Sequence, residues 1–181
     1  WPAPDRKAAM TETVRLAKAM GETGHPVEML RVDGPDLRSR LAVLDATRCV
    51  VFNWCESIPG VSRSEADVVD AIRALGFAHT GSTAGVIRLS ENKDKCKKRL
   101  SVEGIPTPEW KVLDAESARE WNRFPAIVKS SCEHGSAGLS PESVVVNQAE
   151  LCARAAQAVK ESGAPVLVED FIDGREFHVT I

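Results

Sequence analysis

An apolar run within residues 48–53, between Arg48 and Asn53, limits the possible folds of this chain more than any other segment. A run without polar alternation is typical of a parallel strand that helices cover on both faces. Helical periodicity precedes it at residues 5–20 and follows it at residues 68–75, where Gly76 occupies the position favoured for a left-handed C-cap. Residues 1–82 therefore alternate helix and strand, which predicts a small α/β open sheet whose ligands gather at the carboxyl ends of its strands.

Three shorter segments complete the expected first domain, residues 1–88. Residues 25–32 have the pattern of a short strand, and residues 36–44 that of one or two helical turns. Residues 53–62 form the loop at the carboxyl end of the apolar strand. We expect this domain to be a small open parallel sheet with helices beside it.

A second domain, residues 89–181, is expected to be an α+β sandwich. Ser90 is a suitable N-cap for a helix over residues 91–103, which Gly104 ends. A capping box formed by Asn147 and Glu150 begins a later helix. The further predicted elements are strands at residues 109–113, 126–129, 143–146, 165–171 and 175–181, helices at residues 115–122 and 147–162, and a hairpin turn at Asp173 and Gly174. The result would be a sheet of hairpins with two helices packed on it.

Composition excludes several classes of partner. The 23 Lys and Arg residues against 26 Asp and Glu residues give a net charge of −3, which provides no broad positive field for nucleic acid. No stretch approaches the roughly 18 apolar residues of a membrane helix, and the start has no signal-peptide pattern, so we expect a soluble protein. Five cysteines without a C-x-x-C pair indicate a reduced, cytoplasmic protein in which cysteines bind no metal. Because the chain begins with Trp1 and stops at Ile181 inside a predicted strand, we expect it to be a fragment.

Lys129 is the first candidate for chemistry. It ends an apolar strand, and Gly135, Ser136 and Gly138 follow in a loop of small residues. Glycines allow close backbone approach, successive amides can form an anion-binding concavity, and an ammonium supplies charge for phosphate. The loop is not a P-loop, because no G-x-x-x-x-G-K-[ST] occurs. A hairpin loop with a solvated lysine explains the pattern equally well.

Two further segments carry weaker signals. Residues 166–176 form an apolar strand that breaks into a turn, where backbone groups could read a planar base and Glu176 could accept ribose hydroxyls. An ordinary hairpin with surface carboxylates explains that segment more simply. Residues 93–99 carry five positive charges and one negative charge. Because helical charges at successive positions spread around the axis, we expect a solvated face with at most one lysine turned inward.

The order of these pieces resembles the front half of an ATP-grasp ligase of the D-alanine:D-alanine ligase type. The resembling motifs lie at residues 76–82, 92–93, 104–108, 124–138 and 166–177. The resemblance implies an N-terminal α/β domain that lacks its first strand, followed by the central ATP-grasp subdomain, truncated before the C-terminal lobe. It implies nucleotide-binding roles for Lys93 and Lys129 on the phosphates, Glu133 and Ser136 in the flap, Glu169 and Ile172 in the adenine hinge, and Glu176 on the ribose.

The resemblance also implies a reaction. ATP phosphorylates a substrate carboxylate to an acyl phosphate, which an amine attacks to give an amide, with Mg²⁺ across the phosphates. The family's metal ligands are expected beyond Ile181, and no catalytic residue is identified. The partners would be small-molecule carboxylate and amine substrates, with no nucleic acid, no membrane and a possible homodimer.

Departures from the family pattern concern the substrate. Residues 53–56 and 62–66 replace the family's histidine-glycine and Gly-Glu-Asp-Gly patterns, and Gly135 stands where a flap serine positions the first D-alanine. D-alanine is therefore not implied as the substrate. Two other hypotheses stay open: a non-catalytic nucleotide-binding regulatory module with an ATP-grasp cleft, and a purely architectural likeness without nucleotide binding.

Overall fold

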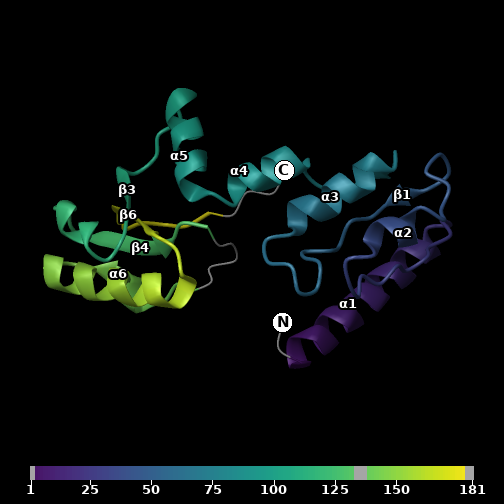
Figure 1. Ribbon diagram of the computed structural model, residues 1–181, viewed down its shortest axis with the longest axis horizontal. Helices are drawn as coiled ribbons and strands as arrows, with labels where there is room; N and C mark the ends of the chain where they lie inside the picture. Colours follow the sequence, from purple (N-terminus) through teal and green to yellow (C-terminus); the bar gives the residue numbers. More distant parts are fainter. Residues whose placement is uncertain (1–2, 133–137, 178–181) are drawn as a thin grey trace. The chain divides into compact units, whose positions relative to one another are not determined.

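The computed structural model describes residues 3–132 and 138–177 of the 181-residue chain. The chain divides into two compact units, Trp1–Ile87 and Arg88–Ile181, coloured purple to teal and teal to yellow in Figure 1. The first contains a two-stranded parallel sheet and the second a four-stranded antiparallel sheet. None of the helices in the described ranges combines the length and the apolar character that crossing a bilayer requires.

The first unit follows the predicted alternation over most of its length. Its elements are α1 (Ala3–Glu22), α2 (Leu37–Leu41), β1 (Val50–Val51), α3 (Glu65–Ala74), β2 (Ala78–His79) and α4 (Ala84–Ser90), the last of which runs into the second unit. The helix over residues 5–20, the short helix within residues 36–44, the apolar strand and the helix over residues 68–75 are confirmed. Gly76 has a φ of 82°, in the left-handed region expected for a C-cap.

The strand predicted at residues 25–32 is wrong, because no described residue of this segment pairs in a sheet. Leu30 and Val32 are still partly buried against the core between α2 and α3. Among the described residues β1 pairs only with β2, and Val50 remains 70% exposed. An extended segment becomes a strand only when its backbone groups find a partner strand, and residues 25–32 have none beside them.

The second unit is built around β6. Its elements are α5 (Lys93–Val102), β3 (Trp110–Leu113), the 3₁₀ helix η1 (Ser117–Glu120), β4 (Ala126–Ser130), the 3₁₀ helix η2 (Pro141–Ser143), β5 (Val144–Val145), α6 (Gln148–Ser162) and β6 (Val166–Asp170). The strand order is β3-β6-β4-β5. Of the neighbouring pairs in this order, only β4 and β5 are consecutive along the chain, so the expected sheet of hairpins is wrong. Strand β6 lies between β3 and β4, and its residues 166–168 are buried on both faces of the sheet. An apolar run without polar alternation suits such an inner position.

Helix α6 covers one face of this sheet (Figure 1). Leu151 and Ala155 on α6 pack with Val128 and Val168 in the unit's core. Since side chains alternate between faces along a strand, Glu169 points away from the α6 side, where it meets α5 through Lys97. Helix α5, predicted as residues 91–103, meets the sheet through the polar contacts of Lys97 with Glu169 and of Asp94 with Trp110.

The ends of three predicted elements are also settled. Asn147 begins α6 as predicted, because its Oδ1 accepts the backbone N–H of Glu150 at 3.0 Å. Ser90 is not the N-cap of α5, since it is the last residue of α4; Asn92 is the cap, and its Oδ1 accepts the N–H of Lys95 at 2.9 Å. The hairpin after β6 is wrong for residues 171–177, which form no strand. Because β3 and β4 already flank β6, a returning strand has no free edge; residues 178–181 lie outside the described part.

Candidate functional site

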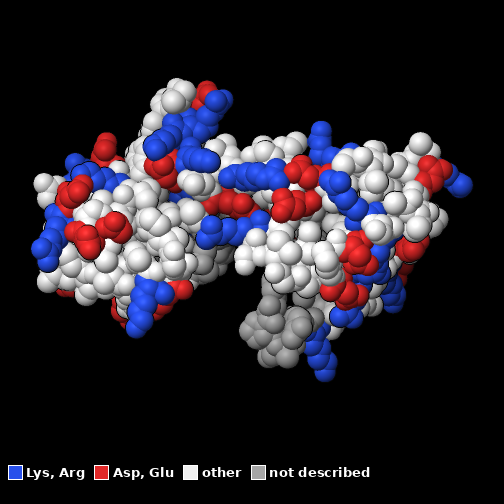
Figure 2. Space-filling model, viewed as in Figure 1, with Lys and Arg blue, Asp and Glu red and all other residues white. Residues whose placement is uncertain are grey.

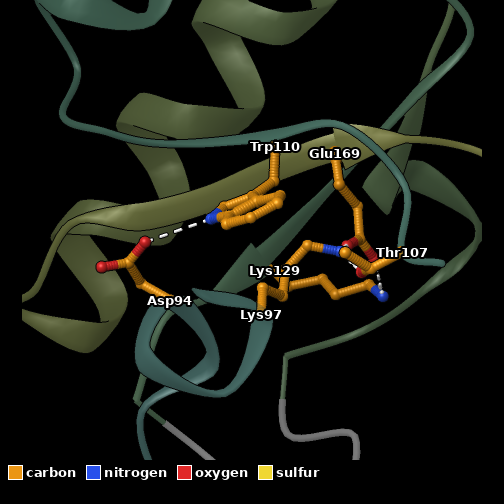
Figure 3. A network of polar contacts seen from close by, with 6 residues as sticks. All are labelled: Asp94, Lys97, Thr107, Trp110, Lys129 and Glu169. Carbon is orange, nitrogen blue, oxygen red and sulfur yellow. Dashed lines mark hydrogen bonds and ion pairs between the residues drawn. The ribbon is translucent and has the colours of Figure 1, made fainter. Parts of the chain in front are cut away.

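The candidate site centres on the carboxylate of Glu169, which two lysines share. Glu169 and Lys97 are both buried, and Lys97 Nζ donates to Glu169 Oε2 at 2.6 Å. Lys129 Nζ donates to the other oxygen, Oε1. Figure 3 shows the two ammonium groups converging on this carboxylate from α5 and β4. Three separate elements therefore meet at one charged cluster.

Lys97 is held on several sides. Its ammonium donates to Thr107 Oγ1 at 2.6 Å and lies 5.1 Å from the centroid of the Trp110 ring, within the range of a cation–π contact. The indole N–H of Trp110 donates to Asp94 Oδ1 at 3.1 Å, which links β3 to α5 one turn before Lys97 (Figure 3). The hydrogen bond from Lys98 lowers the pKa of Asp94, and the bond from Trp110 adds to this lowering.

Lys129 has more freedom. Its side chain is 26% exposed, against 9% for Lys97. Two residues further along, the carbonyl of Ser131 accepts the backbone N–H of Lys93 at 3.0 Å. The start of α5 therefore lies beside the end of β4, and the half-buried Lys93 and Lys129 belong to adjoining segments. Binding of phosphate by these two lysines stays a prediction.

Of the other predicted nucleotide-binding residues, the structure describes Ile172 and Glu176. Ile172 and Glu176 follow β6 and are exposed, and their roles at the base and the ribose stay predictions. Glu133 and Ser136 lie outside the described residues. Glu169 lies in β6, an inner strand of the sheet. The hinge prediction concerned its main chain, whereas the structure shows that its side chain binds the two lysines.

An ion pair fixes the end of β6, next to Glu169. Arg123 Nε donates to Asp170 Oδ1 at 2.8 Å, and Arg123 Nη2 donates to Oδ2. The hydrogen bonds from Arg123 lower the pKa of Asp170, and that carboxylate raises the pKa of Arg123. The N–H of Asp170 also donates to the carbonyl of Glu109, and that of Phe171 to Pro125, each at 3.0 Å. The segment that leads into the predicted hinge is thus fixed at its start.

Sequence reasoning missed this pair and left the inward lysine unnamed. Arg123 and Asp170 are 47 residues apart, and no local motif links them. Lys97 is the lysine of the basic run that turns inward, but its partner lies 72 residues away. Spacing alone could not have identified either contact.

The charges of the site suit an anion better than a metal. Within residues 3–132 and 138–177, no group of three or more His, Cys, Asp and Glu side chains is arranged to hold a metal ion. The five cysteines are free thiols. On the face seen in Figure 2, basic and acidic side chains are interspersed. The described cluster carries two cations on one carboxylate and therefore has a surplus positive charge that a phosphate could balance.

Comparison with protein families connects this geometry with known sequences. Residues 100–181 match the family model described as D-ala D-ala ligase C-terminus. A D-alanine–D-alanine ligase of Aquifex aeolicus is 29% identical over 180 residues, which cover 98% of this chain and 58% of that protein. The corresponding ligase of Rhizorhabdus wittichii is 28% identical over 179 residues, covering 98% of this chain and 55% of that protein. The chain thus spans little more than half the length of these curated relatives.

Solved structures agree with the sequence comparison. The crystal structure of D-alanine–D-alanine ligase from Helicobacter pylori superposes with a TM-score of 0.53 at 27% identity, over 60% of this chain and 33% of that one. The crystal structure of D-alanyl-alanine synthetase A from Vibrio cholerae gives a TM-score of 0.52 at 19% identity, over 64% of this chain and 36% of that one, and supports the fold alone. Sequence and fold therefore point to the same group of proteins.

Proposed function

Because the chain belongs to the D-alanine–D-alanine ligase family of ATP-grasp proteins, we propose that it acts in ATP-dependent carboxylate–amine ligation. The reaction would form an amide or peptide bond through an acyl phosphate. The acid and the amine are small molecules. The residues that depart from the family pattern at 53–56, 62–66 and Gly135 favour a substrate other than D-alanine.

One observation carries the proposal: Lys129 is a partly exposed cation on an already neutralised carboxylate, beside the start of α5. A phosphate that approaches Lys129 gains a charge-assisted hydrogen bond, while Glu169 keeps its bond to Lys97. Lys93 would reach the same phosphates from the first turn of α5. Ile172 and Glu176, on the exposed segment after β6, would meet the base and the ribose.

Mg²⁺ is part of the proposal, but the described residues do not fit it. The cluster offers ammonium groups, whereas Mg²⁺ takes oxygen ligands, chiefly carboxylates and waters. We therefore assign the metal no ligand among residues 3–132 and 138–177 and no step in this part of the site.

The test compares ATP binding by wild type, Lys129→Ala and a control, Lys160→Ala, at an exposed position of α6. Loss of a charge-assisted hydrogen bond worth about 1.5–3 kcal/mol should weaken ATP binding by roughly 10- to 150-fold in Lys129→Ala. Lys160→Ala should bind as wild type does. Equal affinities for all three would favour a purely architectural likeness. ATP binding without ADP release on a panel of carboxylates and amines would favour the regulatory module.

A further inference from the structure

Lys97 has no part in the proposed phosphate contacts, yet it is the more deeply buried of the two lysines on Glu169. Its ammonium has a fixed set of partners: Glu169, the hydroxyl of Thr107 and the face of Trp110. Lys129, in contrast, donates one hydrogen bond within the described part of the chain, to Glu169, and keeps access to solvent. The two cations therefore hold the same carboxylate in different ways.

The charges explain why two lysines are useful here. Removing the single cation from a buried carboxylate strongly destabilises the folded protein, because the carboxylate charge is then unpaired and poorly solvated. If Lys129 alone held Glu169, each transfer of Lys129 to a phosphate would meet that cost. With Lys97 in place, Glu169 stays paired after Lys129 has left.

We propose that Lys97 is a positioning residue that keeps Glu169 paired, so that Lys129 can move between Glu169 and a nucleotide phosphate. This inference rests on the proposed function, because it presumes a phosphate beside Lys129. Lys97 itself contacts no phosphate and acts through Glu169. A purely structural role, in which Lys97 only fastens α5 to β6, is the competing explanation.

The binding test uses Lys97→Met with Lys95→Met, an exposed position of the same helix, as the control. The ligands are ATP and adenosine, which lacks phosphates. Lys97→Met should weaken ATP binding by about 10-fold or more and change adenosine binding by less than about threefold, while Lys95→Met changes neither. An equal loss for both ligands would show that Lys97 only shapes the fold and would overturn the proposal.

A second arm removes the carboxylate charge. In a Glu169→Gln background no anion retains Lys129, so adding Lys97→Met should change ATP affinity by less than about threefold. A loss as large as in the wild-type background would contradict action through Glu169.

The third arm needs no nucleotide. Double-mutant cycles on unfolding should give a larger coupling between Lys97→Met and Glu169→Gln than between Lys129→Met and Glu169→Gln, because Lys97 is the more buried partner. A larger coupling for Lys129 overturns the inference even when wild type binds ATP. If wild type binds no ATP, the proposed function and the transfer of Lys129 both fail, whereas this arm still decides which lysine is the fixed partner.

Discussion

Replacing Glu169 with leucine tests whether the charged cluster stabilises the second unit. The substitution removes the acceptor of both lysines and leaves the ammonium of Lys97 in a site where its side chain is 9% exposed. Thr107 and Trp110 cannot neutralise that charge. Removing one partner of a buried ion pair costs about 3–5 kcal/mol, and the lysine that is 26% exposed adds little because water can solvate it. We expect a loss within this range.

The assay is hydrogen exchange of peptides from β4 and β6, since these strands report on the second unit independently of the first. Glu103→Leu is the matched control. Glu103 also pairs with a cation, Arg99, at 2.6 Å, but the two side chains are 49% and 65% exposed, so the control should lose about 1 kcal/mol or less.

A double variant makes the reasoning refutable. If the cost in Glu169→Leu comes from the unpaired Lys97, adding Lys97→Met should recover most of it, because two apolar side chains then replace the buried pair. The reasoning is wrong if Glu169→Leu costs no more than Glu103→Leu, or if the double variant is less stable than Glu169→Leu alone.

Two further predictions concern the same unit. Leu151→Ala should destabilise it by about 2.7–5 kcal/mol in urea unfolding, because Leu151 is fully buried, whereas Leu139→Ala at a 38% exposed position should cost far less; similar losses would contradict the assigned core. Arg123→Gln should lower the thermal midpoint by a few degrees at pH 7. The pKa of Asp170 is lowered in the folded state, so this stabilisation is present above its unfolded pKa of about 3.9 and is lost as pH falls through the folded pKa; a difference that does not shrink as the pH is lowered below about 3.9 would refute the pairing.

Local patterns predicted the elements whose causes are local. The apolar periodicity of α3, the Gly76 cap and the reciprocal contacts of Asn147 and Glu150 all act within a few residues. The strands β4 and β6 were found in the same way, from short apolar runs. For such elements the sequence pattern and the stabilising contact involve the same residues, so one reveals the other.

The parts that could not be predicted depend on partners distant in the sequence. Residues 25–32 have a strand-like pattern but no strand beside them, and pattern alone does not reveal the absence. Over the described residues 171–177 the hairpin expected after β6 does not form, because β3 and β4 already occupy both edges of that strand. The Arg123–Asp170 pair joins positions 47 residues apart. In each case strand order, which the periodicity of a single strand does not encode, decides the outcome.

Which lysine of α5 faces Glu169 also depends on partners that are distant in the sequence. Helix α5 has cations at residues 93, 95, 97, 98 and 99 and no wide apolar stripe, so hydrophobic burial alone does not set its rotation. Its rotation follows instead from polar contacts on one side, where Asp94 meets Trp110 and Lys97 meets Glu169. Family motifs could therefore indicate Lys93 and Lys129, whereas only the packing of α5 against β3 and β6 identifies Lys97. A residue selected in this way escapes motif analysis, yet it controls whether Glu169 can release Lys129.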